Sequence, residues 1–115
     1  MKNFILQLIS QIKSGRHHGR GSKYTRNGNF ELALSHFKTA LKFALLSGND
    51  ALVPLEMECV ARTLVRIGDY EQAQKYANDS YCLYKKFQGE GPVFDESIKR
   101  VEELLTLIER RDIIH

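Results

Sequence analysis

The chain repeats itself at an offset of 40 residues, and this repeat limits what it can fold into more than any other feature. The segment 26–33 reads RNGNFELA, and the segment 66–73 reads RIGDYEQA. Six of these eight positions are identical or chemically equivalent. A period of this length is typical of proteins that stack one helical unit on a copy of itself.

The residue types in the repeated block suit a tight turn between two helices. Gly28 and Gly68 can adopt a positive φ, which ends a helix. Asn29 and Asp69 come next, and their side chains can accept hydrogen bonds from the first free N–H groups of the following helix. The block therefore predicts a helical hairpin that occurs twice.

The rest of the chain predicts an all-α protein with two stacked helical hairpins, a leading amphipathic helix and a trailing capping helix. Apolar residues recur at helical spacing, and the chain has only two prolines. The expected helices span residues 3–13, 16–27, 30–47, 51–67, 70–87 and 93–111. We assign residues 1–14 to the N-terminal helix and residues 15–115 to one helical domain. Within that domain the repeats lie at about 16–47 and 51–87, and the capping helix lies at 93–111.

A stripe of large apolar residues marks the N-terminal helix. Its members follow the i, i+3, i+4 spacing of an amphipathic helix: Phe4, Ile5, Leu8, Ile9 and Ile12. The segment is too short to cross a bilayer. Because the open ends of a helical stack need cover, we expect the stripe either to cap the first hairpin or to dock on a partner, a second copy of the chain included.

No motif of a catalytic or metal site is present in the sequence. It has no G-x-S-x-G, no phosphate-binding glycine loop and no H-E-x-x-H. His17 and His18 are adjacent, so on a helix they point roughly 100° apart and cannot chelate one ion together. Cys59 and Cys82 form no C-x-x-C pair and are interpreted as reduced thiols of a cytoplasmic protein. We therefore expect no enzyme activity, no metal and no cofactor.

The repeated block resembles the tetratricopeptide repeat, whose pattern runs W-x2-L-G-x2-Y, then A-x3-F, then P. Gly21, Tyr24, Ala33 and Phe37 match this pattern, whereas polar residues replace its Trp and Leu and the closing Pro is absent. The resemblance covers residues 16 to about 87, with a repeat longer than the usual length of about 34 residues. HEAT and armadillo repeats, with periods of about 40–47 residues, are the structural alternative. The resemblance implies an α-solenoid that acts as an adaptor or scaffold in protein–protein interaction.

The resemblance also implies a concave groove, which is lined by the first helix of each hairpin and binds a peptide or protein. The family's groove positions fall on residues of both copies: His18, Ser22, Arg26, Leu55, Arg62, Val65 and Arg66. Arg26 and Arg66 occupy equivalent places in the repeat. We therefore expect a partly basic groove that favours a partner with acidic residues.

Basic residues gather in the first half of the chain, which suggests an alternative function. Residues 1–50 contain eight Lys or Arg against two acidic residues, for +6, whereas residues 51–115 contain nine against twelve, for −3. The alternative is a nucleic-acid-associated protein that uses the basic segment 13–26. The two functions differ in salt dependence, because contacts with phosphates weaken steeply as salt rises.

Overall fold

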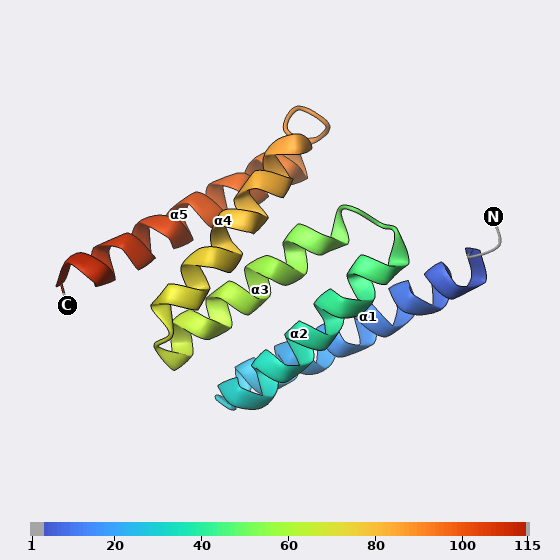
Figure 1. Cartoon of the computed structure of the whole chain (residues 1–115), viewed down its shortest axis with the longest axis horizontal. Coiled ribbons are helices and arrows are strands. Elements are labelled where there is room, and N and C mark those ends of the chain that lie inside the picture. Colours follow the sequence, from blue (N-terminus) through green and yellow to red (C-terminus); the bar gives the residue numbers. More distant parts are fainter. Residues whose placement is uncertain (1–3, 115) are drawn as a thin grey trace.

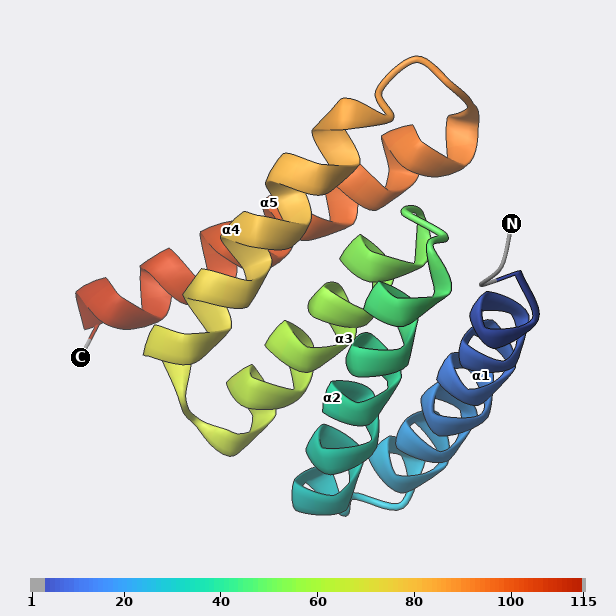
Figure 2. The same cartoon turned by 45° about the vertical axis from the view of Figure 1, so that its right-hand side comes forward.

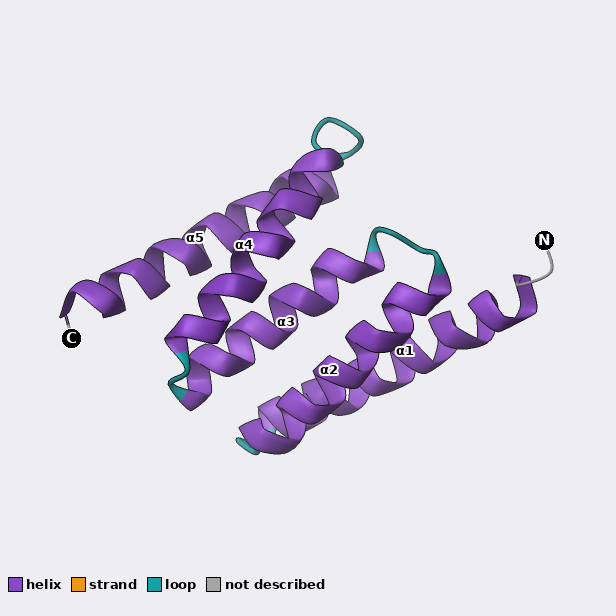
Figure 3. Cartoon of the chain, viewed as in Figure 1, coloured by secondary structure: helices purple, strands orange, loops and turns teal. Residues whose placement is uncertain are grey.

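The computed structural model of the chain describes the backbone of residues 4–114 and the side chains of residues 4–111. Within this range it contains five helices: α1 (Phe4–Arg26), α2 (Phe30–Ser47), α3 (Leu52–Ile67), α4 (Tyr70–Lys86) and α5 (Pro92–Ile114). Short loops join the helices, and the described residues form no strand (Figure 3). The prediction of an all-α protein is confirmed.

The helices lie side by side in the order in which they occur in the sequence (Figure 1 and Figure 2). α1 lies at one edge and α5 at the other, and each helix packs mainly against its neighbours in the chain. The larger hydrophobic cluster extends from α2 to α5 and includes Phe37 of α2, Leu64 of α3 and Ile108 of α5. A second, smaller cluster joins Leu41 and Ala44 of α2 to Val53 of α3. Among the described helices, none combines the length and apolar character that a bilayer crossing requires.

The two predicted turns have nearly the same geometry. Gly28 has a φ of 77° and Gly68 a φ of 98°, so both adopt the left-handed conformation that glycine favours. Asn29 accepts a hydrogen bond from the Leu32 N–H at 3.4 Å, and Asp69 accepts one from the Gln72 N–H at 3.1 Å. The backbone angles of these two capping residues agree within a few degrees. Each turn joins two helices that pack against each other, α1 with α2 and α3 with α4.

The prediction of two separate helices at 3–13 and 16–27 is wrong, because α1 is continuous from Phe4 to Arg26. Gly15 and Gly19 do not adopt a positive φ, and both lie on exposed parts of the helix. Each glycine costs a helix interior about 1 kcal/mol relative to alanine. Packing of α1 against α2 offsets this cost, and the Ser14 hydroxyl donates to the Ala40 carbonyl at 2.9 Å. The four other helices begin and end close to the predicted residues.

The apolar stripe of α1 does not cap the first hairpin. The residues of α1 that are buried are small or polar, namely Ser14 and Gly21. The stripe lies on the other side of the helix, where its side chains are 42–69 % exposed and belong to no buried cluster: Phe4, Ile5, Leu8, Ile9 and Ile12. Docking of this stripe on a partner stays a prediction.

Candidate functional site

Two adjoining hollows form a groove on the face that α1, α3 and α5 share. Their volumes are about 290 and 300 Å³, and both are lined by Thr25, Arg62 and Thr63. We call their combined surface the Arg groove. Its other lining residues come from four helices: Ser22, Arg26, Phe37, Cys59, Val65, Arg66, Leu104 and Leu107. The groove therefore combines guanidinium groups with apolar side chains.

Most of the predicted groove residues lie together in this groove. Five of the seven line it, namely Ser22, Arg26, Arg62, Val65 and Arg66. The other two do not. Leu55 is half-buried on α3 and is not part of the lining. His18 forms a hydrogen bond with Glu56 of α3 and so ties two helices together.

The three arginines of the groove differ in how their charge is used. Arg62 pairs with Glu58 one turn earlier on α3, with 3.2 Å between Nη2 and Oε2. Arg66 lies over the ring of Phe30, with its guanidinium carbon 5.5 Å from the ring centroid. Arg26 forms no ion pair with any side chain in residues 4–111. Arg26 and Arg66 also lie in the last turns of α1 and α3, where a positive charge complements the helix dipole.

A buried carboxylate on α3 connects this helix to α4 and α5. Glu58 is only 4 % exposed. Arg100 of α5 donates to both of its oxygens at 2.9 and 3.1 Å, and the Tyr84 hydroxyl of α4 donates to it at 3.0 Å. Burial alone would raise the pKa of Glu58, but the hydrogen bonds and positive charge of Arg100 outweigh it and lower this pKa below its usual value. Glu58 is thus an ionised group inside the fold.

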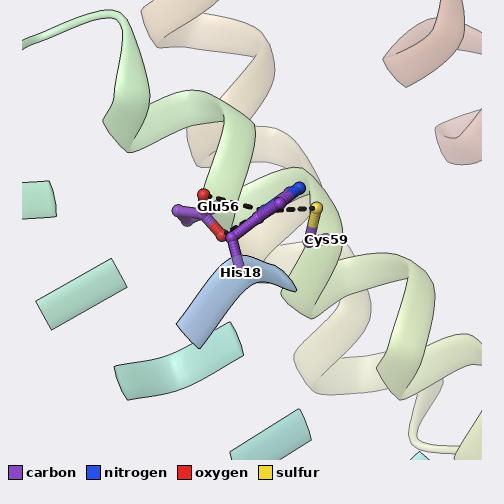
Figure 4. A group of neighbouring side chains, drawn as sticks. All are labelled: His18, Glu56 and Cys59. Atoms are coloured by element: carbon purple, nitrogen blue, oxygen red, sulfur yellow. Dashed lines mark hydrogen bonds and ion pairs between the residues drawn. The ribbon is translucent and has the colours of Figure 1, made fainter. Parts of the chain in front are cut away.

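A second buried carboxylate, two residues earlier on α3, faces α1. Glu56 is 2 % exposed, and both of its carboxylate oxygens lie 3.0 Å from Nδ1 of His18. The Sγ atom of Cys59 lies 4.0 Å from the same nitrogen (Figure 4). The hydrogen bond with Glu56 raises the pKa of His18, although burial opposes this effect. We call these three residues the His18 cluster.

The His18 cluster contains the residue types of a cysteine hydrolase but not their geometry. In such a site one imidazole nitrogen faces the thiol and the other faces the carboxylate. Here the same nitrogen, Nδ1 of His18, faces both partners. Burial and the neighbouring carboxylate of Glu56 raise the pKa of Cys59 to about 12, so its thiol is protonated at neutral pH. This arrangement suits hydrogen bonding and metal coordination better than nucleophilic attack.

Sequence reasoning missed the His18 cluster and the buried role of Glu58. Cys59 is 41 residues from His18 in the chain, so no local motif joins them. Acidic residues in an amphipathic helix are usually taken as part of its solvated face. The only available hint was the i, i+3 spacing of Glu56 and Cys59, which places them on one side of α3.

Comparison of the chain with protein-family models, with curated proteins and with solved structures found no match. The groove has the features of a binding surface, with hollows, apolar ground and accessible charge. The cluster is a separate feature that shares only Cys59 with the groove lining.

Proposed function

We propose that this protein is a non-enzymatic adaptor of the tetratricopeptide type, which binds a peptide or protein partner in the Arg groove. Three features support this proposal. The turns repeat at an offset of 40 residues with the same capping geometry. The helices pack in sequence order. The equivalent arginines of the two copies, Arg26 and Arg66, both line the groove.

The chemistry of the groove fits a partner that carries acidic and apolar residues. Arg26 offers a guanidinium that is exposed and has no ion-pair partner among residues 4–111, so carboxylates can reach it. The hollow beside Arg66 has an apolar lining made of Val65, Leu104 and Leu107. The main support for the proposal is that Arg26, which has no ion-pair partner among residues 4–111, lies in a groove with an apolar lining. Arg62 contributes less, because Glu58 already pairs with it.

Reversing the groove charges should weaken binding of an acidic peptide. We expect the double variant Arg26→Glu, Arg66→Glu to lower the affinity for a labelled peptide of alternating Glu and Leu by at least tenfold, about 1.4 kcal/mol. The affinity is measured by fluorescence anisotropy at physiological salt. A peptide of alternating Lys and Leu is the ligand control, and it should bind the wild-type protein weakly.

The matched variant control carries the same change in net charge away from the groove. Lys38 of α2 and Lys75 of α4 are exposed and do not line it. The double variant Lys38→Glu, Lys75→Glu should bind the acidic peptide as the wild type does. Equal losses in both double variants would show that the overall charge attracts the peptide, and the groove would then not be the binding site.

The basic face of α1 favours the second candidate, a nucleic-acid-associated function. Four exposed basic residues of α1 are spaced three or four residues apart and so share one side of the helix: Lys13, Arg16, Arg20 and Lys23. Lys13 also lies over the ring of Phe43, with its ammonium nitrogen 5.3 Å from the ring centroid. Binding of single-stranded DNA that falls by orders of magnitude between low and physiological salt would support this candidate over the peptide adaptor.

The exposed stripe of α1 supports a further proposal, that two copies of the chain associate through it. Residues 4–12 contain five stripe residues and no charged residue. A two-fold pairing of identical faces would therefore bury apolar surface without bringing like charges together. Contiguous apolar surface of this kind on a folded protein is typical of an interface. The pairing would also cover the open edge of the stack at α1.

We expect the wild-type protein to dimerise, and the variant Leu8→Gln, Ile12→Gln to weaken the dimer at least tenfold. Both side chains are about half exposed, so the monomer fold should not change. Sedimentation equilibrium over a range of concentrations measures the effect. The variant Leu45→Gln, Val93→Gln removes exposed apolar side chains from α2 and α5 and should leave the dimer intact. A wild-type protein that stays monomeric throughout would contradict this proposal.

A further inference from the structure

The His18 cluster brings three different metal-binding side chains together from two helices. α1 supplies an imidazole nitrogen, and α3 supplies a carboxylate and a thiol at i, i+3 spacing (Figure 4). One ligand atom from each residue lies within 4.8 Å of the other two. The shortest separation is 3.0 Å, between His18 and Glu56, and Cys59 lies 4.0 Å from His18. Among the described residues this is the one such group of three.

These separations suit a small tetrahedral ion. Zinc binds nitrogen and oxygen at about 2.0–2.2 Å and thiolate sulfur at about 2.3 Å. Ligand atoms around such an ion are therefore roughly 3.3–3.8 Å apart. Two of the separations in the cluster, 3.0 and 4.0 Å, bracket this range, and the third is within 4.8 Å. Side-chain shifts of roughly an ångström would therefore close the site. A set of one nitrogen, one oxygen and one sulfur ligand also suits zinc better than magnesium or calcium, which prefer oxygen alone.

The charge balance of the cluster also favours a cation. Glu56 is 2 % exposed, and His18 is its only side-chain hydrogen-bond partner among residues 4–111. This contrasts with Glu58, which has three partners for its carboxylate. The imidazole of His18 is therefore the one side chain in this range that compensates the buried carboxylate, and a buried carboxylate without compensation is costly. A divalent cation with one carboxylate and one thiolate would form a neutral group. The thiol proton of Cys59 and the proton on Nδ1 of His18 would both leave these atoms when the ion binds, the first to the solvent and the second to the solvent or to Nε2 of the same ring.

The cluster is accessible to an ion from the solvent. The side chain of His18 is 33 % exposed. Cys59 lines the hollow of about 290 Å³ in the Arg groove. A bound ion would therefore keep a fourth position open toward this hollow, where a water molecule or an anionic group of a ligand could reach it. Arg26 and Arg62 line the same hollow and would favour an anionic group there.

We propose that His18, Glu56 and Cys59 form a transition-metal site, best suited to Zn²⁺, which ties α1 to α3 and leaves one coordination position open to the Arg groove. The site goes beyond the adaptor function, because peptide binding by the arginines does not need it. Its occupation would link the first hairpin to the second through three coordination bonds. Zinc should therefore raise the melting temperature of the folded chain.

Cobalt(II) provides a direct test, because a thiolate bound to Co²⁺ gives a charge-transfer absorption that oxygen and nitrogen ligands do not give. Cys82 is exposed and offers a competing thiol, so all samples carry Cys82→Ser. We expect one Co²⁺ ion per chain with a thiolate band, displacement of Co²⁺ by Zn²⁺, and a higher melting temperature with Zn²⁺. Absence of the thiolate band at millimolar Co²⁺ would overturn the proposal.

Single variants assign the ligands. Adding Cys59→Ser should abolish the band, and His18→Gln or Glu56→Gln should weaken Co²⁺ binding at least tenfold. The matched control is His17→Gln, because His17 lies against His36 of α2, with 3.0 Å between their Nδ1 atoms. This control should bind Co²⁺ as the parent does. Unchanged affinity in His18→Gln, or an equal loss in His17→Gln, would contradict the assignment.

If Glu56→Gln prevents folding, the metal-binding test relies on Cys59→Ser, which changes the size of the side chain very little. Circular dichroism establishes that each variant is helical before metal is added. In folded Cys59→Ser protein, Zn²⁺ should no longer raise the melting temperature. An undiminished rise would place the zinc elsewhere and overturn the proposal.

Discussion

Replacing Glu58 by alanine should lower the free energy of unfolding by about 3–4 kcal/mol. The carboxylate is buried and accepts hydrogen bonds from Arg100 and Tyr84. Its removal leaves the Tyr84 hydroxyl, on a residue that is 2 % exposed, without an acceptor and takes the counter-charge from Arg100. Breaking a buried pair by removing one partner typically costs about 3–5 kcal/mol. The lower part of this range applies because the Arg100 side chain is 42 % exposed and can be hydrated.

Urea unfolding at neutral pH measures this effect, and two variants serve as controls. Glu58→Gln keeps an acceptor for Tyr84 and should fall between the wild type and Glu58→Ala. Arg62→Gln removes only the exposed partner on the same helix and should cost less than about 1 kcal/mol. A loss below 1 kcal/mol in Glu58→Ala would show that the carboxylate does not hold α3, α4 and α5 together.

The same substitution at two glycines of α1 should have opposite effects. A Cβ atom at Gly21 would lie 2.7–2.8 Å from three ring atoms of Phe37, which is 5 % exposed. The buried ring cannot move without disturbing the core, so Gly21→Ala should destabilise the protein by about 2 kcal/mol. A Cβ atom at Gly19 would meet nothing within 4 Å, so Gly19→Ala should stabilise it by about 1 kcal/mol.

The repeat itself explains the constraint at Gly21. The residues 40 positions after Gly21 and Phe37 are Ala61 and Ala77, and both are fully buried. The first copy thus combines a glycine with a large ring, whereas the second combines two methyl groups. The double variant Gly21→Ala, Phe37→Leu should therefore be more stable than the sum of its single effects predicts. Thermal unfolding of the four proteins measures this coupling, and shifts of the same sign in Gly19→Ala and Gly21→Ala would contradict the steric argument.

The features that could be predicted from the sequence are those set by residues close together in the chain. The left-handed glycines and the capping side chains of Asn29 and Asp69 follow from residue type and position, and the structure confirms them. The predicted boundary between two helices near Gly15 is wrong, because a glycine lowers the stability of a helix without ending it. The contacts of α1 with α2 keep the helix continuous there. Five of the seven residues that the resemblance placed in a groove line the Arg groove, and their role in binding stays a prediction. His18 was misplaced because its partner Glu56 lies 38 residues away.

The burial of two acids on α3 could not be predicted for a related reason. Glu56 and Glu58 are charged, and charged residues are rarely buried unless another part of the chain pairs with them. Their partners are His18 and Arg100, which flank α3 in the fold but lie far from it in the sequence. A single sequence does not show such pairs, since the pairing depends on which helices become second neighbours in the stack.

These two acids connect helices that are not consecutive in the chain. Packing joins each helix to the next, but the contacts of Glu56 with α1 and of Glu58 with α5 pass over a helix. They lie two residues apart on α3 and point to opposite sides of it. We expect each contact to limit the relative motion of the helices on its own side of α3. Loss of one contact should loosen that half of the molecule while consecutive helices stay packed. The rigidity of the molecule and its stability can therefore vary separately.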